Sequence, residues 1–550
     1  MTKAFPLLMI LLVTSVLSKS QVAVNYYRLF LTDKNYSSFS VDNPEEFLSK
    51  KAIQRRIKQD IEIKTNDLPV SKYYTDSLIR LGLQIRSQSK WMNSVVIYSD
   101  DHELTDTITS YSFIRSKQKA VSSLKSTHIK NNFVRNKDVL FVSEQTNLID
   151  YGYANTQISM LNGHVLHRSG YQGTGVTIAV IDAGFYKVNE LSAFDSLFKN
   201  NLILGTRDFV DGDREVFDAS SHGMKVLSTM GSHLPGQIVG TAPKANYWLL
   251  RSEQTGSENS IEEDYWVAAA EFADSVGCDI ISSSLGYSEF DDSLQNYFYA
   301  NMDGNTTIIT KAADVAASKG MLVVNSAGNL GDNDWLYISA PADGDSVLAV
   351  GAVDEFAQYV YFSSIGPSFD GRIKPNVSAM GYQTTVLGNN GETTLSNGTS
   401  FSAPLIAGMA ACLWQCLPEL NNFEILKKIE QSAHQYSNPD FRIGYGIPDF
   451  AKAANLINTN ILTFTQTTFI KVYPNPFENL ITIELSHKTK EKVFISLFSI
   501  MGNKIVEQKT NSNAHTIITL ENLHNLPAGI YILQITVGSQ LIQKRISKTK

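Results

Sequence analysis

The stretch of sequence that decides the fold runs from Asn397 to Gly408 and reads Asn-Gly-Thr-Ser-Phe-Ser-Ala-Pro-Leu-Ile-Ala-Gly. A Gly-led turn presents Ser400 and leads into an apolar, Ala-rich segment through Leu417, which predicts a buried helix that begins at Ser400. Unpaired N–H groups at a helix start carry partial positive charge and would stabilise an oxyanion formed there. Two interpretations are open: a nucleophile, or an N-cap serine over a core helix.

The composition is that of a multidomain globular protein. The chain has 550 residues, of which 43% are hydrophobic and 18% charged, and its net charge of -7 argues against a nucleic-acid binder. Residues 1–20 combine Lys3 with an apolar run from Phe5 to Leu17, which predicts a secretory signal peptide. No other apolar stretch approaches the roughly 20 residues of a membrane span, so we expect no transmembrane segment in the mature chain.

The cysteines Cys278, Cys412 and Cys416 lie in or beside predicted helices, and no His or carboxylate accompanies them at ligand spacing. We interpret them as small apolar core residues rather than a metal or disulfide site.

Residues 21–123 mix short strands and helices and predict a small α+β domain. The expected strands are Val24–Leu31, Leu83–Ile85 and Ser94–Tyr98, and the expected helices are Pro44–Gln59, Ser71–Leu81 and Asp100–Ser110. The polar stretch Ser116–Asn147 lacks periodicity, so we expect an exposed connector that contains the maturation cut, with the linker proper at 124–148.

Residues 149–457 have the pattern of an α/β domain with a parallel sheet. Continuous apolar runs predict strands at Val176–Ile181, Tyr247–Leu250, Asp279–Ser283, Met321–Asn325 and Val347–Val350, with helices such as Glu262–Val276 and Thr307–Lys319 between them. A linker at 458–468 follows. Alternating apolar residues then predict a small β-sandwich over residues 469–550.

Acyl transfer needs a nucleophile, a base, an acid that orients the base, and oxyanion donors. Three further motifs supply candidates beside Ser400: Val180-Ile181-Asp182-Ala183-Gly184, Ser221-His222-Gly223, and Ser326-Ala327-Gly328-Asn329. Each motif alone is equally well explained by a strand-end turn or a helix start.

Together, in this order, the motifs resemble those of the subtilisin-like serine proteases, or subtilases. The resemblance covers the whole middle domain and extends to further landmarks: Gly240–Pro243, Ser284–Gly286, Ser363–Pro367, Asp370–Pro375 and Gly444–Gly446. It implies a subtilisin-like parallel sheet with helices on both faces, preceded by the α+β prodomain and followed by the β-sandwich.

The resemblance also implies roles for individual residues. Ser400 would be the nucleophile, His222 the general base and later the acid, and Asp182 the group that orients the imidazole. Asn329 and the Ser400 N–H would form the oxyanion hole. Substrate backbone would pair with Ser284, Leu285 and Gly286, which line the pocket together with Ser326, Ala327 and Gly328, and we expect broad specificity with an apolar tilt.

Several positions depart from the family pattern. Ala183 stands where a hydroxyl residue usually follows the aspartate, Met224 and Lys225 replace the usual Thr-His, Phe401-Ser402 replaces Met-Ala, and Asn376 replaces Asp. These departures leave the triad intact. They motivate an alternative function, a weak or inactive subtilase-fold adhesin. An esterase or lipase would need a Gly-Xaa-Ser-Xaa-Gly elbow, which residues 398–402 do not supply.

An insertion, Tyr287–Ile309, carries Asp291, Asp292 and Asp303, and we favour a solvated acidic loop over a selector of basic residues. Subtilases commonly bind structural calcium, and Asp303-Gly304-Asn305 or Asp332-Asn333-Asp334 could supply oxygens. The spacing is not diagnostic, so no metal site is assigned and no cofactor is expected.

The flanking domains resemble known accessory domains of secreted proteases. The first is similar to a propeptide that assists folding and blocks the cleft, so we expect a zymogen. The last resembles a type IX secretion sorting domain through Val472–Phe477, Pro527–Tyr531, Lys548 and Lys550. The resemblance implies protein substrates, the type IX machinery as partner, and a monomer at the surface or in the medium of a Gram-negative cell.

Overall fold

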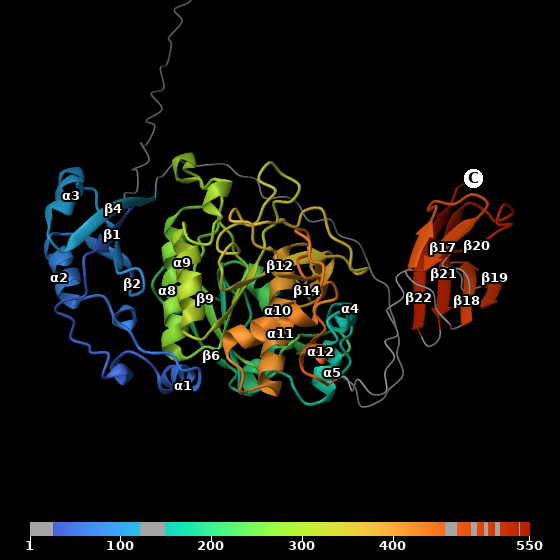
Figure 1. Cartoon of the computed structure of the whole chain (residues 1–550), viewed down its shortest axis with the longest axis horizontal. Helices are drawn as coiled ribbons and strands as arrows, with labels where there is room; N and C mark the ends of the chain where they lie inside the picture. Colours follow the sequence, from blue (N-terminus) through green and yellow to red (C-terminus); the bar gives the residue numbers. More distant parts are fainter. Residues whose placement is uncertain are drawn as a thin grey trace, which may run out of the picture. The chain divides into compact units, whose positions relative to one another are not determined.

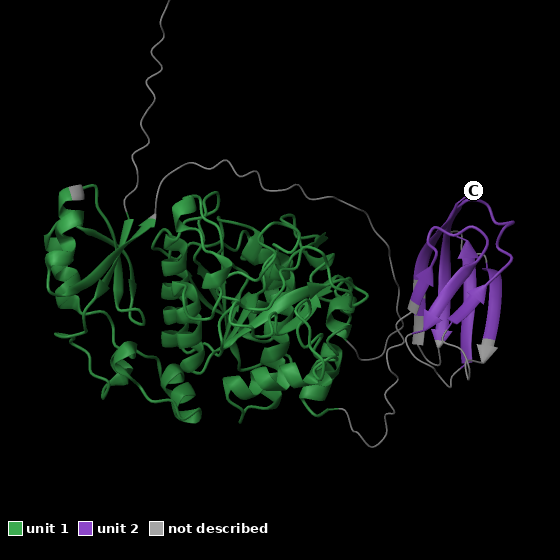
Figure 2. Cartoon of the chain, turned by 45° about the horizontal axis from the view of Figure 1, so that its top comes forward, with its two compact units in different colours: residues 1–456 green, residues 457–550 purple. Residues whose placement is uncertain are grey.

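The computed structural model describes residues 26–121, 149–456, 470–485, 492–499, 504–511, 517–537 and 540–549. The chain divides into two compact units, Met1–Leu456 and Ile457–Lys550 (Figure 2). The predicted signal peptide at 1–20 and the linkers at 124–148 and 458–468 lie outside the described residues, so these assignments stay predictions.

A parallel sheet forms the centre of the first unit. Within residues 149–456 it has seven strands in the order β13-β12-β11-β10-β5-β9-β6. Their bounds are β5 Thr177–Asp182, β6 Ile203–Asp208, β9 Asn246–Arg251, β10 Ile280–Ser283, β11 Leu322–Ser326, β12 Val347–Val353 and β13 Val377–Met380. The five predicted strands form the interior, and the edge strands β6 and β13 were not predicted.

Helices cover both faces of this sheet (Figure 1). On one face α8 (Ile261–Val276) and α9 (Ile308–Ser318) pack side by side and share an apolar core with β5, β10 and β11. On the other, α7 (His222–Gly231) packs on α10 (Thr399–Cys416), which lies against β10 to β13. The predicted buried helix after Ser400 is therefore confirmed.

Shorter elements complete this domain: α4 Asn155–Ser159, α5 Gly163–Arg168, α6 Asp195–Lys199, α11 Asn422–Ser432, α12 Phe450–Ala453 and the strands β7 His233–Leu234, β8 Ile238–Val239, β14 Thr384–Leu387 and β15 Thr393–Ser396. Gly408 lets α10 approach the loop before β9, because a Cβ there would lie 2.0 Å from Thr241 Oγ1. This contact explains why the chain has both Gly408 in α10 and the motif Gly240–Pro243 before β9.

The N-terminal domain is an antiparallel sheet with α2 packed on one face, whereas α1 contacts α8 of the middle domain. Within residues 26–121 the strand order is β2-β3-β1-β4. The elements are β1 Tyr26–Leu31, α1 Lys50–Lys58, α2 Lys72–Arg80, β2 Gln84–Ser89, β3 Ser94–Tyr98, α3 His102–Thr107 and β4 Ile114–Val121.

Two predictions for this domain were wrong. The helix expected over Pro44–Gln59 is broken, because Ser49 caps α1 by accepting from Ala52 N after a short 3-10 turn at Pro44–Glu46. The connector does not begin at Ser116, since β4 continues to Val121 by pairing with β1. A Lys- and Ser-rich edge strand carries little hydrophobic signal, so only its partner strand reveals it.

Buried ion pairs join this domain to the face of α8. Asp274 of α8 accepts from Arg55 at 2.5 Å, Arg56 at 2.9 Å and Lys90 at 3.3 Å, and its side chain is fully buried. Arg28 pairs with Asp264 at 2.6 Å. A buried charge is stable only with its partners, so separating the N-terminal domain from α8 would leave these buried charges unpaired.

The second unit is a β-sandwich. Among its described residues one sheet has the order β16-β17-β20 and the other β19-β18-β21-β22, and side chains of both share one core. The bounds are β16 Ile470–Tyr473, β17 Ile481–Leu485, β18 Lys492–Ser499, β19 Lys504–Asn511, β20 Ile517–Leu520, β21 Gly529–Val537 and β22 Gln540–Lys548. The predicted sandwich is confirmed.

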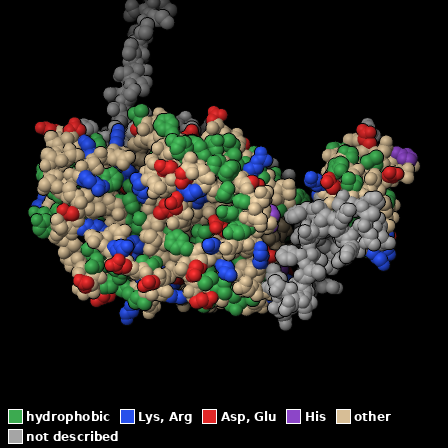
Figure 3. All heavy atoms as spheres, in the orientation of Figure 1, with side chains coloured by type: hydrophobic (Ala, Val, Ile, Leu, Met, Phe, Trp, Pro, Cys, Tyr) green, Lys and Arg blue, Asp and Glu red, His purple; other side chains and the backbone are tan. Residues whose placement is uncertain are grey.

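Global properties follow the composition. Among the described residues no helix has both the length and the apolarity that crossing a membrane requires. On the face drawn in Figure 3, basic and acidic side chains are interspersed over the first unit. The three cysteines are free; Cys278 and Cys412 are buried as predicted, whereas Cys416 is only half-buried.

Candidate active site

The candidate residues converge at the carboxyl edge of the sheet. Asp182 is the last residue of β5, Ser283 ends β10 and Ser326 ends β11, and all three strands run parallel. The carboxyl ends of parallel strands lie at one edge, where α/β proteins bind ligands. The segments that follow these strands carry the predicted substrate-binding residues.

Asp182 and His222 form the best defined contact of the site. His222 Nδ1 lies 2.8 Å from Asp182 Oδ1, and Asp182 is fully buried. Gly223 makes this approach possible, because a Cβ there would lie 2.5 Å from Gly184 O and 2.9 Å from Asp182 Cβ. The His-Gly pair therefore has a steric cause: α7 can begin against the end of β5 only without a side chain at this position.

The second carboxylate oxygen of Asp182 is poorly satisfied. Oδ1 also accepts from Ala183 N at 2.7 Å, whereas among the described residues no group donates to the buried Oδ2. The family pattern that the sequence resembles implies a hydroxyl side chain at the position of Ala183. The departure noted in the sequence thus leaves a buried acceptor without a donor.

Ser400 lies in the first turn of α10, and 7% of its surface is exposed. Its carbonyl accepts from Ser284 Oγ at 2.9 Å, which ties the helix start to the segment after β10. The next residue, Phe401, is buried with its ring centroid 6.0 Å from that of His222. Phe401 therefore supplies an apolar wall beside the imidazole, and Ser402 is buried in the helix.

Asn329 is held beside the same helix start. Its Oδ1 accepts from Thr399 N at 2.8 Å and from Thr399 Oγ1 at 3.0 Å. With the amide oxygen fixed in this way, the nitrogen Nδ2 lies on the other side of the group, 3.5 Å from where a Cβ on Gly398 would be. Asn329 is exposed, so its N–H groups can reach a substrate.

The two predicted substrate segments meet at a residue that the sequence did not single out. A Cβ on Gly286 would lie 2.3 Å from Ser339 Oγ, and one on Gly328 would lie 3.1 Å from the same atom. Asn325 Nδ2 donates to Leu285 O at 2.9 Å and bridges the segments. Ser339 is buried in a loop and had no motif to mark it; only the fold places it between the glycines.

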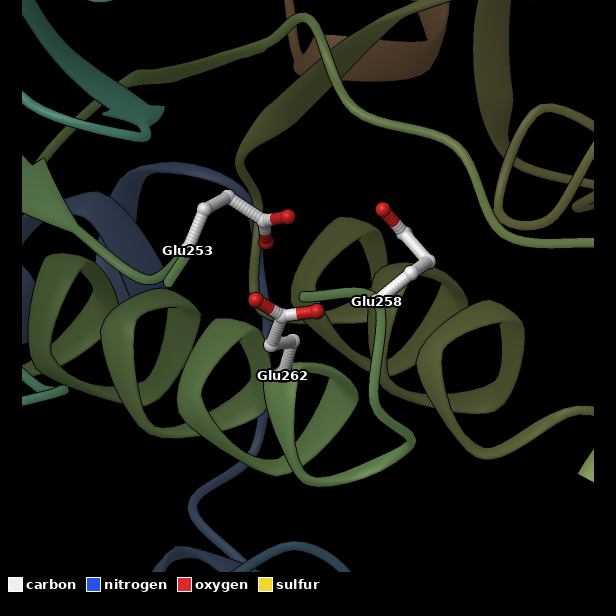
Figure 4. A group of neighbouring side chains, drawn as sticks. All are labelled: Glu253, Glu258 and Glu262. Atoms are coloured by element: carbon white, nitrogen blue, oxygen red, sulfur yellow. The ribbon is translucent and has the colours of Figure 1, made fainter. Parts of the chain in front are cut away.

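A second group missed by sequence reasoning is a cluster of carboxylates. Glu253, Glu258 and Glu262 each offer an oxygen within 4.8 Å of the others, and Figure 4 shows Glu253 and Glu262 pointing toward each other. Glu262 accepts from Gln254 N at 2.7 Å and Asn259 N at 3.0 Å. Glu262 therefore organises the loop after β9, which explains its burial without an ion.

Burial and mutual repulsion perturb these carboxylates. Burial, together with the charge of Asp182, raises the pKa of Glu253 to about 7, against the lowering effect of Tyr287 and His222. Burial and the charges of Glu253 and Glu258 raise the pKa of Glu262 to about 10. The cluster is thus partly protonated at neutral pH.

The other acidic candidates have local roles. Asp303 accepts from Asn305 N and Thr306 Oγ1, and the buried Asp292 caps a short turn by accepting from Leu294 N. Asp291 accepts from Glu258 N at 3.1 Å. The prediction of a solvated acidic loop was therefore wrong for Asp292, because the loop folds back on its own backbone.

The remaining departures are Met224 and Lys225 in the first turn of α7 and Asn376 before β13. Met224 is buried in the core under α7, and Lys225 is half-buried. Asn376 accepts from Lys374 Nζ at 3.1 Å and donates to Glu430 at 2.8 Å, so it replaces a charge by a structural hydrogen bond.

The middle domain matches a known protein family. A model of the subtilase family matches residues 173–446. The subtilisin of Bacillus pumilus is 30% identical over 301 residues, which cover 54% of this chain and 97% of that protein. The chain belongs to the subtilase family. It is therefore a subtilisin-like serine endopeptidase, as its motifs predicted.

Other relatives cover more of the chain. Subtilisin NAT of Bacillus subtilis subsp. natto is 27% identical over 383 residues, which are 69% of this subtilase and 85% of that protein. The crystal structure of MycP1 from the ESX-1 type VII secretion system superposes with a TM-score of 0.43. The two chains share 23% sequence identity, and the match covers 57% of this chain and 88% of that chain.

The flanking domains also match known families. Residues 26–136 match the peptidase S8 propeptide domain of Bacteroidota, and residues 471–549 match a secretion system C-terminal sorting domain. Both predictions from the sequence are confirmed. This subtilase is accordingly a secreted or cell-surface protein made as a precursor.

Proposed function

We propose that this subtilase hydrolyses internal peptide bonds through an acyl-enzyme formed on Ser400. The observation that carries the proposal is the 2.8 Å contact of His222 Nδ1 with the buried Asp182, together with the position of Ser400 in the first turn of α10. This contact leaves Nε2 of the imidazole as the nitrogen that can accept a proton from Ser400.

Each of the proposed catalytic residues acts in a defined step of the hydrolysis. His222 takes the proton of Ser400 Oγ as Oγ attacks the peptide carbonyl, and it returns that proton to the leaving amine. Asp182 fixes the tautomer and stabilises the transient imidazolium. Asn329 Nδ2 and the Ser400 N–H donate to the oxyanion. Water attacks the acyl-enzyme by the reverse sequence, with His222 again as the base.

The proposed partners follow from the same assignment. The substrates are proteins or peptides with broad preference and an apolar tilt, bound along Ser284–Gly286 and Ser326–Gly328. No cofactor is required, the mature enzyme is a monomer, and export uses the type IX machinery of a Gram-negative cell. Calcium bound for structural reasons is compatible with this chemistry but has no assigned ligands.

The proposal is tested by incubating the secreted mature protein with casein and a peptide library. We expect cleavage at many sites, enriched after apolar residues. The adhesin alternative predicts a folded protein that binds surfaces but cleaves nothing, so the absence of cleavage by folded, propeptide-free protein would contradict the proposal.

Asn329→Ala is expected to lower kcat by about 10²–10³-fold and to change KM little, because one donor to the oxyanion is lost only in the transition state. The measurement is steady-state kinetics on one cleaved peptide. Asn390→Ala is the control, since Asn390 is an exposed residue of the β14–β15 turn. Equal kinetics for both variants would remove Asn329 from the oxyanion hole.

Ser339→Gly is expected to raise the preference for Phe over Ala before the cut by about tenfold, since a small volume added to an apolar pocket changes binding by about 1–3 kcal/mol. The reason is that Ser339 Oγ fills the space between Gly286 and Gly328. Ratios of kcat/KM for paired peptides measure the effect. An unchanged ratio would place the side chain of the substrate elsewhere.

A further inference from the structure

The loop after β9 brings Glu253 next to the Asp182–His222 pair. In the parallel register of β5 and β9, Asp182 pairs with Arg251, and Ser252 N donates to Asp182 O at 3.0 Å. Glu253 follows directly. Although the residue is partly exposed, its carboxylate is buried, so its charge is poorly screened from the triad.

A second contact links Glu253 to the substrate side of the site. Tyr287 OH donates a hydrogen bond to Glu253 Oε1, and Tyr287 directly follows the predicted substrate segment Ser284–Gly286. Tyr287 is buried and fixed by backbone hydrogen bonds with Ala340. The carboxylate therefore has a fixed position between the loop, the substrate segment and the triad.

The charges around Glu253 come from several elements. Asp182 at the end of β5 and His222 at the start of α7 both act on it, and Glu262 of α8 and Glu258 of the loop lie beside it. On its own strand, the Arg251 guanidinium pairs with Asp208 and Asp211, and Arg251 Nε donates to the Glu253 carbonyl.

We propose that Glu253 is a positioning residue of this subtilase: it places a second buried carboxylate beside the Asp182–His222 pair and thereby sets the acid limit of activity. The inference rests on the proposed function of the triad. When Glu253 is ionised it favours the imidazolium, which cannot accept the proton of Ser400. Neutral Glu253 removes this effect, so the two groups titrate as a coupled pair.

Removing the charge of Glu253 is expected to extend activity to lower pH. Activity rises with pH as His222 loses its proton, and an ionised Glu253 delays this loss to higher pH. Glu253→Gln keeps the shape of the side chain and removes the charge. The acid limb of kcat/KM is therefore expected to move to lower pH by about 0.5 pH unit or more, while activity above pH 9 changes less than about threefold.

The experiment measures kcat/KM against pH on one peptide for the mature wild type, Glu253→Gln, Glu258→Gln and Tyr287→Phe. Glu258→Gln is the matched control, because Glu258 belongs to the same cluster but faces solvent in part; its limb should stay within about 0.2 pH unit of wild type. Tyr287→Phe removes the hydrogen bond that lowers the pKa of Glu253, so its limb should move in the same direction as that of Glu253→Gln.

Fluorophosphonate titration of active sites accompanies each profile, so the two hypotheses fail differently. A folded wild type that is neither labelled nor active would overturn the proposed function and this inference with it. An active wild type with an acid limb identical to that of Glu253→Gln would overturn the inference alone. So would a loss of activity in Glu253→Gln that is equal at every pH, since that marks a structural role. If Glu253→Gln does not fold, Tyr287→Phe decides by the same criteria.

Discussion

The Ser400→Ala variant is expected to lose peptide hydrolysis almost completely, with kcat lower by about 10⁴–10⁶-fold. In the proposed mechanism this hydroxyl forms the acyl-enzyme, and the other hydroxyls of the first turn of α10, on Thr399 and Ser402, are fully buried. Turnover of a cleaved peptide by purified mature protein measures the effect. Substrate binding should persist, because the backbone of Ser400, which accepts from Ser284, is unchanged.

Ser402→Ala is the matched control for this variant. Ser402 lies in the same helical turn and is fully buried, and among the described residues its Oγ has no hydrogen-bond partner. Removing that hydroxyl breaks no hydrogen bond, so activity should stay within a few-fold of wild type. If both serine variants retained activity, the nucleophile would have to lie elsewhere.

Asp274→Ala is expected to destabilise the precursor by about 3–5 kcal/mol, because it leaves Arg55 and Lys90 buried without their anion and leaves Arg56 with Asp67 alone. Burial alone would raise the pKa of Asp274, but these cations hold it well below its usual range. The carboxylate therefore keeps its charge, and its stabilising effect, at neutral and mildly acidic pH; both are lost only when the pH falls to the lowered pKa.

The measurement is denaturant unfolding of the full precursor in a Ser400→Ala background, which prevents self-cleavage. Asp76→Ala is the control, since Asp76 forms an exposed pair with Lys72 at 2.7 Å and should cost less than about 1 kcal/mol. Equal stability of the Asp274→Ala and Asp76→Ala precursors would show that the propeptide is held by its apolar contacts, such as those of Trp91, rather than by charge.

The sequence predicted the interior of the sheet because β5, β10, β11 and β12 are buried along their whole length, β9 is buried at Tyr247, Leu249 and Leu250, and all five strands contain apolar runs. The edge strands β6 of this sheet and β4 of the N-terminal sheet were not predicted, for the converse reason. Residues Ile203–Asp208 mix Gly, Thr, Arg and Asp with apolar residues, and Ile114–Val121 is rich in polar residues. Strands of this kind form because a neighbour offers hydrogen bonds, which a single sequence does not show.

Some residues of the candidate site were predicted from the sequence, and others were found only in the structure. The proposed catalytic residues each stand in a local motif, so residue types and motif order were enough to predict them: Asp182, His222, Asn329 and Ser400. Ser339 and Glu253 do not, since their significance comes from neighbours on other elements: Gly286 and Gly328 for the serine, the triad and Tyr287 for the glutamate. Residues that act through tertiary proximity alone leave no mark in the sequence.

Covalent labelling of the secreted, mature protein with a fluorophosphonate, followed by peptide mapping, tests whether Ser400 is the nucleophile. We expect one adduct per molecule, on the peptide that contains Ser400, and none after His222→Ala, since the imidazole is needed to activate the hydroxyl. A correctly folded wild-type protein that remains unlabelled, or that is labelled at another serine, would contradict this assignment.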